Sequence, residues 1–239
     1  MKKAIVIGAT SGIGRELTKI LAKNNYIVGF TGRRGELLRE LSKEITSKSY
    51  WKEFDISANE SMSNLECLIE EMGKVDLIII CSGCGFINPE LDFNKEKLTI
   101  DVNVSGFTAM VNIAMKHFIH QKAGHVVGIS SIAALRGSGS GPAYSASKAF
   151  VSNYLEGLRQ NVNKLALPIT ITNIQPGFVD TFMAQGEGLF WVASPKKAAL
   201  QIYKKILDKK SHAYITKRWR VVACLLKIIP GGLYKKLYF

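Results

Sequence analysis

Residues 4–21 read AIVIGATSGIGRELTKIL and combine three local patterns in a fixed order. Ala4–Ile7 is a short apolar run, rich in β-branched residues, that is typical of a buried strand. Gly8–Gly14 holds three glycines and suits a tight turn. Ile13 and Leu17 then share one face of a helix. A buried strand, a glycine turn and an amphipathic helix predict the first unit of an α/β sheet.

The same alternation continues along the chain. Further strands are predicted at Tyr26–Phe30, Val75–Ile80, His125–Ile129 and Ile169–Ile174. Helical periodicity lies between them, for example over residues 100–121. Because strands that alternate with helices form βαβ units, we expect an α/β fold with a doubly wound, mostly parallel sheet in a single domain.

Composition excludes several classes of protein. The chain has 239 residues, of which 47% are hydrophobic and 21% charged, and this is typical of a globular domain. Four cysteines are too few for a disulfide scaffold. No uninterrupted apolar run reaches about 18 residues, so we expect no conventional membrane-spanning helix and a cytoplasmic location.

The glycine turn is a candidate site for the phosphates of a cofactor. Glycine lets the backbone approach a phosphate closely, and the start of the following helix offers unpaired N–H groups. The alternative is a tight turn that binds no ligand. The predicted contact residues are Gly8, Thr10, Ser11, Gly12, Ile13 and Gly14.

The end of the second strand indicates which dinucleotide is bound. A carboxylate at this position would pair with the ribose hydroxyls of NAD, but the chain has Arg33 and Arg34 instead. Guanidinium groups suit a ribose 2′-phosphate, so NADP(H) is favoured over NAD(H), unless both arginines are simply solvated at the start of a helix. Asp55 and Ile56 are predicted to border the adenine, although Asp55 could equally cap a helix.

A tyrosine and a lysine are spaced for acid–base chemistry. Tyr144 and Lys148 lie at i and i+4, so a helix places them on the same face. An ammonium group nearby should lower the tyrosine pKa from its usual value of about 10. Ser131 ends an earlier strand, where its hydroxyl would point into the ligand crevice of the sheet.

These motifs, taken in order, resemble those of the short-chain dehydrogenase/reductases, which have a Rossmann-like fold. The resemblance covers roughly residues 3–210 and rests on Gly8–Gly14, Asn103, Ser131, Tyr144-x-x-x-Lys148 and residues 176–181, Pro-Gly-Phe-Val-Asp-Thr. It implies hydride transfer between a nicotinamide and a carbonyl or alcohol, and a homo-oligomer.

The resemblance also assigns roles to individual residues. It implies that Tyr144 is the general acid/base, that Lys148 holds the ribose and depresses the tyrosine pKa, and that Ser131 binds the substrate oxygen. It implies that Asn103 orders a water beside the lysine. The residues it places at the nicotinamide or close to the cofactor are Gly83, Pro176, Gly177, Val179 and Thr181.

One motif departs from the family. Its usual Asn-Asn-Ala-Gly is replaced here by residues 80–83, Ile-Cys-Ser-Gly, so other contacts must stabilise the centre of the sheet. The alternative function is a non-catalytic NADP(H)-binding sensor or scaffold on the same fold, against which the intact Ser131, Tyr144, Lys148 and Asn103 argue.

Two further patterns are better explained by packing. Cys81 and Cys84 could form a redox pair or half a zinc site, but the chain has no second C-x-x-C. His117 and His120 share a predicted helix without an obvious carboxylate partner for a metal. We therefore predict no metal site.

The predicted substrate is a hydrophobic carbonyl or alcohol. The segments expected to shape its pocket are Gly85-Phe86, Ala133–Gly141 and Phe178–Val192, the last of which would be a mobile lid with Phe178, Phe182, Met183, Leu189, Phe190 and Trp191. Residues 1–210 would form the dinucleotide-binding and catalytic domain, and residues 211–239 a C-terminal extension.

The extension carries nearly all the excess charge. The net charge of the chain is +13, and residues 196–239 hold 12 Lys and Arg against the single acid Asp208. Basic residues with Trp and Tyr around the apolar run Val221–Ile229 suit peripheral contact with the inner face of a membrane. The alternatives are a cover over the pocket or a dimer contact. No nucleic-acid motif is found, and we expect no nucleic-acid partner.

Overall fold

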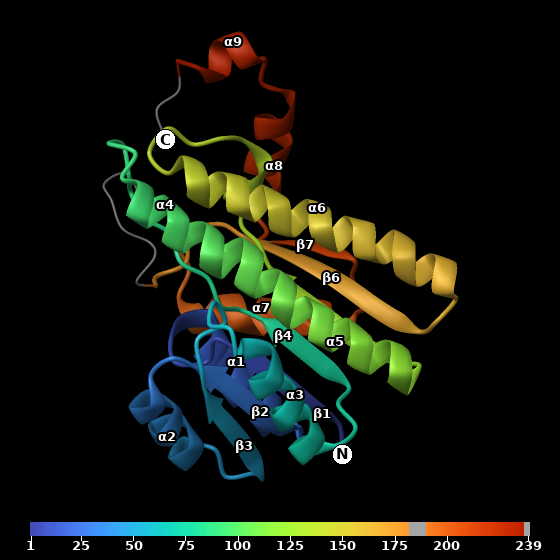
Figure 1. The fold of residues 1–239 in the computed structure, drawn as a ribbon. Coiled ribbons are helices and arrows are strands. Elements are labelled where there is room, and N and C mark those ends of the chain that lie inside the picture. Colours follow the sequence, from blue (N-terminus) through green and yellow to red (C-terminus); the bar gives the residue numbers. More distant parts are fainter. Residues whose placement is uncertain (182–189, 237–239) are drawn as a thin grey trace.

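A computed structural model describes residues 1–181 and 190–236 of the chain, and its centre is a seven-stranded parallel sheet (Figure 1). The strands follow the order β3-β2-β1-β4-β5-β6-β7. Their bounds are β1 Lys3–Ile7, β2 Ile27–Gly32, β3 Ser49–Glu53, β4 Leu77–Ile80, β5 Gly124–Ile129, β6 Ile169–Pro176 and β7 His212–Ile215. Since β1 pairs with β2 on one side and β4 on the other, the strand order reverses there, which is where such sheets bind ligands.

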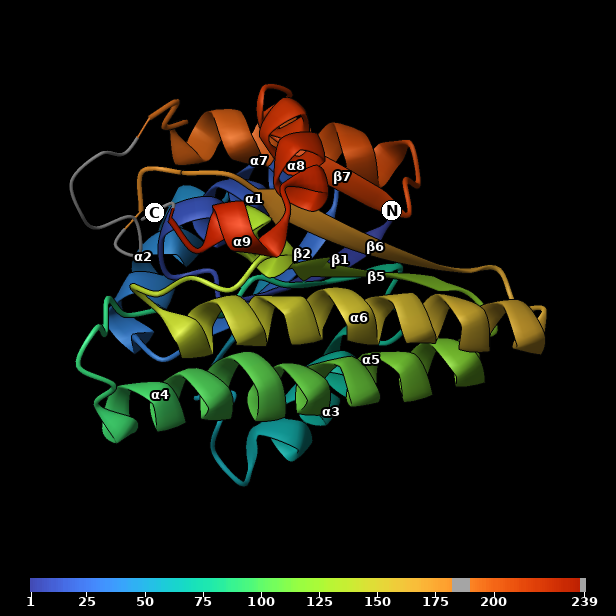
Figure 2. The same cartoon turned by 90° about the horizontal axis from the view of Figure 1, so that it is seen from above.

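Helices cover both faces of the sheet, as Figure 2 shows from above. On one face lie α1 Gly12–Lys23, α2 Gly35–Glu44 and α7 Pro195–Leu207. On the other lie α3 Ser61–Met72, α5 Phe107–Gln121 and α6 Pro142–Leu165. The central strands β1 and β4 are buried on both faces, which explains their continuous apolar sequences.

A long helix over residues 93–121 combines three parts. They are α4 Phe93–Ile100, a π-helical segment Asp101–Gly106 and α5. By length and composition this helix could cross a membrane, with a mean hydropathy of 1.2 in its most apolar window. However, Met110, Val111 and Phe118 are buried against the sheet. We therefore interpret it as a core helix, in agreement with the helix predicted over residues 100–121.

The C-terminal region begins later than the sequence suggests. β7 extends the sheet to Ile215, beyond the predicted domain end at residue 210. A short strand of four residues with an exposed first residue gives little periodicity to detect. Two helices follow, α8 Trp219–Ile228 and α9 Gly231–Tyr234, and Figure 1 shows them at the opposite end of the molecule from α2 and β3.

Helix α7 begins at Pro195 after a side-chain cap. Ser194 is its N-cap, and its hydroxyl accepts a hydrogen bond from the Lys197 amide at 3.3 Å. Pro195 occupies the first helical position, where its missing N–H costs no helical hydrogen bond.

Candidate active site

The glycine loop packs too closely for side chains. Gly8 has a φ of +91°, a conformation that L-residues rarely adopt, and its amide donates to the Thr31 carbonyl at 3.0 Å. A Cβ at Gly14 would collide with the Gly8 carbonyl oxygen, so strand and helix meet here through bare backbone. Ile13 is half-buried against the core on this face. The first N–H groups of α1 thus follow this backbone turn directly, without a side-chain cap from Ser11.

The two arginines after β2 occupy different places. Arg34 donates to the hydroxyls of Thr10 at 2.7 Å and Ser11 at 2.9 Å, and so joins the end of β2 to the glycine loop. Arg33 is also exposed and pairs with Asp55 at 3.4 Å. Of the two, Arg34 thus lies directly beside the predicted phosphate site.

Asp55 does not cap a helix but closes a turn after β3. Its carboxylate accepts hydrogen bonds from the Ser57 amide at 2.9 Å and the Ser57 hydroxyl at 2.7 Å. Partial burial favours the protonated acid, but these bonds and the charge of Arg33 outweigh it and lower the pKa of Asp55. The next residue, Ile56, is buried, and its carbonyl lies against Gly106 in the π-helical segment.

Ser131, Tyr144 and Lys148 come together between β5 and α6. The Ser131 hydroxyl hydrogen-bonds the Tyr144 side chain. The Lys148 ammonium is buried, donates to the Ile129 carbonyl at 3.1 Å and lies 5.8 Å from the centroid of the Tyr144 ring. The helical spacing of tyrosine and lysine is thus confirmed in α6.

Asn103 completes this group from the π-helical segment. Its Oδ1 accepts from the Cys84 amide at 2.9 Å, and its Nδ2 donates to the Cys84 carbonyl at 2.7 Å and to Ser147 at 3.0 Å. A Cβ on Gly83 would lie 3.2 Å from both Asn103 Oδ1 and Lys148 Nζ. Gly83 therefore keeps a narrow gap beside the lysine, and π-helical turns are often found at such functional positions.

The tyrosine pKa differs from the value that its sequence context predicts. Burial raises the pKa of Tyr144, and the charge of a Cys84 thiolate would raise it further, while the hydrogen bond with Ser131 acts in the opposite direction. Burial also lowers the pKa of Lys148 to about 8. The net pKa of Tyr144 is thus raised and not lowered for the protein groups alone, because burial of the phenol is the largest effect, and the role of Lys148 stays a prediction.

The turn after β6 carries the residues predicted at the nicotinamide. Thr181 packs near Gly12, since a Cβ there would lie 3.1 Å from its methyl group, and its hydroxyl donates to the Val179 carbonyl at 3.2 Å. Pro176 ends β6 and pairs with Ile215 of β7. Gly177 lies under the Trp219 ring so closely that a Cβ would collide with the indole.

The sequence that replaces the family's asparagines is held by main-chain bonds. The Cys81 amide donates to the Ile7 carbonyl at 2.8 Å, and Ser82 packs directly on Gly8. Burial raises the pKa of the Cys81 thiol to about 12, so this thiol is a neutral packing group rather than a nucleophile. The expectation that other contacts stabilise this part of the sheet is met by these bonds.

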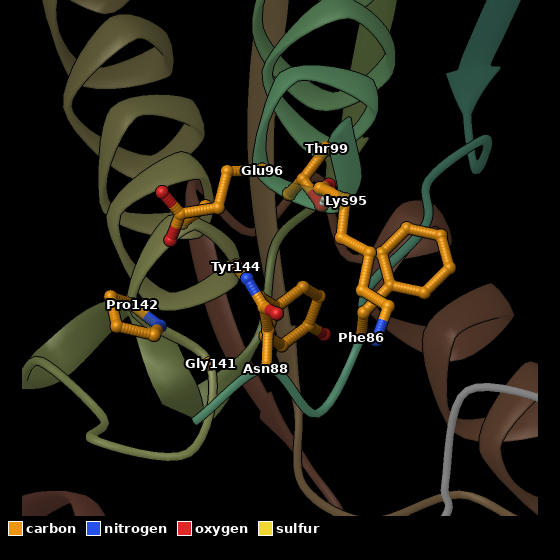
Figure 3. A pocket seen from close by; sticks show the side chains of 9 residues that line it. Phe86, Asn88, Lys95, Glu96, Thr99, Gly141, Pro142 and Tyr144 are labelled. Atoms are coloured by element: carbon orange, nitrogen blue, oxygen red, sulfur yellow. Dashed lines mark hydrogen bonds between the residues drawn. The ribbon is translucent and has the colours of Figure 1, made fainter. Parts of the chain in front are cut away.

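A small pocket of about 10 Å³ opens beside Tyr144 (Figure 3). Figure 3 shows the Tyr144 ring between Phe86, from the loop after β4, and Pro142, from the start of α6. Gly85 packs against this ring, since a Cβ would lie 2.5 Å from Tyr144 Cδ2. The predicted segment Gly85-Phe86 thus borders the catalytic tyrosine candidate.

An aromatic cluster lies on the other side, where the lid was predicted. Its members are Phe178, Phe190, Trp191 and Trp219, with ring centroids 5.1 to 6.3 Å apart. Phe182, Met183 and Leu189 lie outside the described residues, and the lid stays a prediction.

The C-terminal helices fold back on the loop after Ser131. Arg136 donates to the carbonyls of Leu226 at 3.2 Å and Ile229 at 2.8 Å, and its guanidinium stacks on Tyr234 at 4.2 Å from the ring centroid. The Tyr234 hydroxyl in turn donates to the Gly137 carbonyl at 2.6 Å. Part of Ala133–Gly141 is therefore covered by the extension.

Sequence reasoning missed a polar network under α6. Ser130 donates to the Lys148 carbonyl at 2.8 Å and bonds Ser152 at 2.9 Å, Gln175 donates to Ser152 at 3.1 Å, and His212 bonds Gln175 at 2.7 Å. These residues come from four separate elements, so no local pattern could reveal them. The network fixes the helix that carries Tyr144 and Lys148.

Cysteine and histidine form no metal cluster in the described ranges 1–181 and 190–236. Cys81 and Cys84 are both free thiols, and His117 is half-buried with its pKa lowered by burial.

The residues present fit a dinucleotide. The bare-backbone glycine loop, the Arg34 guanidinium above Thr10 and Ser11, and the gap kept by Gly83 beside Lys148 lie along one edge of the sheet. Glycine loop and helix terminus suit a pyrophosphate, and a buried lysine donor suits ribose hydroxyls.

Comparisons with known proteins agree with this geometry. Residues 2–189 match the short chain dehydrogenase family. A protein of Myxococcus xanthus (strain DK1622), named as an uncharacterized oxidoreductase, is 35% identical over 184 residues, which cover 74% of this chain and 72% of that protein.

Two solved structures share the fold. A short chain dehydrogenase/reductase from Burkholderia phymatum in complex with NAD has a TM-score of 0.84 at 19% identity, covering 94% of this chain and 92% of that one. An alcohol dehydrogenase from the archaeon Thermococcus sibiricus, complexed with 5-hydroxy-NADP, has a TM-score of 0.80 at 20% identity, covering 90% and 96%. The chain therefore belongs to the short-chain dehydrogenase/reductase family and is an NAD(P)-dependent oxidoreductase.

Proposed function

We propose that this enzyme uses NADP(H) to interconvert an apolar carbonyl compound and its alcohol, with Tyr144 as the general acid/base. The proposal rests on one observation: Lys148 and Asn103 both lie close to Gly83. Lys148 is one helical turn from Tyr144 on α6. Ser131 reaches the same phenol by a hydrogen bond. Ser131 and Tyr144 can therefore act on one reacting oxygen, with the charge of Lys148 close to the phenol.

The roles follow from these positions. In the reductive direction, bound NADPH would supply a hydride to the carbonyl carbon. Ser131 donates a hydrogen bond to the carbonyl oxygen, and Tyr144 transfers its phenolic proton to that oxygen as the C–O π bond opens. The product is an alcohol, and the remaining phenolate is stabilised by the positive charge of Lys148.

Burial of the phenol favours the role of proton donor. Because the pKa of Tyr144 is raised, the phenol is protonated at neutral pH and ready to give its proton to a developing alkoxide. The pKa of Lys148, near 8, leaves most of this amine charged at neutral pH, where it can bind the ribose. Asn103 holds the Cys84 main chain and so maintains the Gly83 gap.

The preference for NADP(H) rests on Arg34. Its guanidinium already bonds Thr10 and Ser11, so a 2′-phosphate placed there would meet one charge and two hydroxyl groups. Arg33 supports the adenosine side through its ion pair with Asp55. The absence of a carboxylate at the end of β2 agrees with this choice.

The substrate class rests on the aromatic surroundings. Phe86 lies beside Tyr144, and Phe178 and Trp219 flank the turn at Gly177.

We further propose a cytoplasmic homo-oligomer that contacts the inner face of a membrane through its C-terminal helices. The exposed apolar side chains Phe93 and Ile100 on α4 give a second copy a surface to cover.

Turnover of NADPH with a panel of apolar ketones and aldehydes tests the catalytic role. The wild type should oxidise NADPH, and Tyr144→Phe should lose roughly 10²- to 10⁴-fold in kcat. Affinity for NADPH, measured by fluorescence titration, should stay within about threefold. Unchanged turnover in the variant would remove Tyr144 from the reaction. NADPH binding without turnover of any carbonyl by the wild type would favour a sensor or scaffold.

A pair of charge reversals tests the cofactor. Arg34→Asp should weaken NADPH binding by more than about tenfold and raise the preference for NADH, because it removes the charge beside Thr10 and Ser11. Arg33→Asp is the matched comparison and should act more weakly, since that side chain pairs with Asp55, whereas Arg34 bonds the glycine loop. Equal ratios of NADPH to NADH affinity in all three proteins would show that the 2′-phosphate is bound elsewhere.

A further inference from the structure

Helix α8 has two apolar faces, of which the protein covers one. Its inner face packs Trp219, Val222, Ala223 and Leu226 against the loop after Ser131 and the turn at Phe178. Val221, Leu225 and Ile228 follow one another at helical spacing on the opposite face, with 62%, 52% and 74% of each residue exposed. Three large aliphatic side chains on one exposed face form a continuous stripe, which we call the outer stripe.

Cations surround the outer stripe. Arg220 and Lys227 lie along one flank of the helix, while Lys217 and Arg218 precede it and Lys235 and Lys236 follow it, all of them exposed. The only acidic residue after position 195 is Asp208, which precedes β7 and forms an ion pair with Lys205 at 4.0 Å. Residues 217–236 therefore carry only positive side-chain charges, so the charge of this segment is complementary to an anionic partner.

An exposed tryptophan lies at the beginning of the helix. The Trp191 ring is 6.3 Å from the Trp219 ring, and the Arg218 guanidinium lies 5.8 Å from the Trp191 centroid. Phe190 and Val192, on either side of it, are exposed as well. Tryptophan paired with arginine beside an aliphatic stripe is the combination that suits the boundary between lipid headgroups and acyl chains.

The inner contacts keep the outer stripe facing solvent. Trp219 is 3% exposed and packs on Gly177, and Arg136 holds the last carbonyls of α8. Because both ends of the helix are fixed to the catalytic body, the helix cannot turn its outer side chains inward without losing these contacts.

We propose that the outer stripe of α8, with its cationic rim, docks on an anionic lipid bilayer with the helix lying in the interface. A nucleic acid would match the cations but would leave the aliphatic stripe in water. A second copy would match the stripe but would oppose two positive surfaces. An anionic bilayer satisfies both, because its headgroups pair with the cations while its acyl region takes the aliphatic side chains.

Docking would bring the catalytic site close to the lipid. The helix that lies on the bilayer carries Trp219, which packs on the turn at Gly177, so the apolar side of the proposed substrate site opens near the acyl region. This consequence for substrate access rests on the proposed function. The docking itself depends only on the surface of α8.

Sedimentation with vesicles tests the docking of the full-length protein. The wild type should bind vesicles of phosphatidylcholine mixed with phosphatidylglycerol and bind pure phosphatidylcholine far more weakly, and added salt should reduce the binding. Leu225→Glu places a charge in the outer stripe and should weaken binding by more than about tenfold. Leu207→Glu is the matched control: Leu207 is also 52% exposed, but it lies on α7, and this variant should bind as the wild type does.

Two results would overturn the proposal. One is equal binding of the wild type and Leu225→Glu to the anionic vesicles, or no binding by either. The other is that Leu225→Glu dissociates an oligomer of the wild type in solution while neither protein binds vesicles, which would assign the stripe to a second copy. Turnover of a water-soluble carbonyl should be unchanged in both variants. If turnover is absent in the wild type while docking is intact, the proposed function fails and the docking stands.

Discussion

The glycine loop at residues 8–14 and helix α8 both reach the carboxyl edge of the sheet, but they are held there by different means. The loop is fixed by main-chain contacts between neighbours, such as Gly14 on Gly8 and the Gly8 amide on Thr31. Helix α8 is fixed by a few side chains from distant parts of the chain, chiefly Trp219 on Gly177 and Arg136 on the last carbonyls. The attachment of the C-terminal region should therefore depend strongly on single residues.

The largest expected effect follows from removing the tryptophan. Trp219→Ala leaves a cavity between α8 and the turn at Gly177 and should lower the free energy of unfolding by about 3–5 kcal/mol, measured by urea denaturation. Val221→Ala, on the exposed side of the same helix, should change it by no more than about 0.5 kcal/mol. A loss below about 1 kcal/mol for Trp219→Ala would show that α8 contributes little to the cooperative fold.

A buried histidine lies at the amino edge of the sheet, opposite the edge that the glycine loop and α8 reach, and makes the stability of the protein depend on pH. His125 bonds Thr172 at 2.7 Å, and burial, reinforced by the charge of Lys209, lowers the pKa of His125 to about 4. The unfolded chain takes up this proton below about pH 6.5, while the folded chain does not until about pH 4. Stability should therefore decrease as the pH falls from about 6.5 to about 4, by up to about 1.4 kcal/mol per pH unit.

The variant His125→Asn isolates this contribution. Its stability should vary less steeply over the same window, because the variant lacks the His125 imidazole. Some dependence on pH should remain, because His117 and His212, whose pKa values are also lowered, are present in both proteins. Equal slopes for the two proteins would contradict the assignment. Unfolding curves followed by tryptophan fluorescence and by circular dichroism should coincide if α8 and the sheet form one cooperative unit.

A glycine substitution tests the rigid side of the comparison. Gly14→Ala places a methyl group against the Gly8 carbonyl, which cannot move without disturbing β1, and should cost about 1–3 kcal/mol of stability and weaken NADPH binding. Gly157→Ala is the control. No atom outside the backbone of its own helix α6 lies within 4 Å, so alanine should stabilise the protein by up to about 1 kcal/mol. Normal NADPH affinity in Gly14→Ala would mean that the loop adapts.

The smallest effect is expected at the guanidinium that holds α8. Arg136→Lys keeps the charge but loses the planar group that bonds two carbonyls and stacks on Tyr234, and should cost about 1 kcal/mol. Lys227→Arg, on the exposed flank of α8, is a conservative control that should have no measurable effect. A larger loss in the control than in Arg136→Lys would show that the carbonyl contacts are not what holds the helix.

The same contrast explains what the sequence could predict. The strand, glycine turn and first helix follow from neighbouring residues, and so does the helical pairing of Tyr144 with Lys148. The packing of Trp219 on Gly177 joins residues far apart in the chain, and no spacing rule links them. The pKa of Tyr144 could not be predicted either, because it depends on burial, which only the assembled fold determines.

The contacts between Asn103 and the Cys84 main chain require a side chain of one particular kind. The amide oxygen of Asn103 accepts a hydrogen bond from the Cys84 N–H and its amide nitrogen donates one to the Cys84 carbonyl, so both halves of the group bond the main chain. An aspartate of the same shape would turn a carboxylate toward the Cys84 carbonyl and leave that oxygen without its donor. An amide side chain can bond both the N–H and the C=O of Cys84, because it carries an acceptor and a donor.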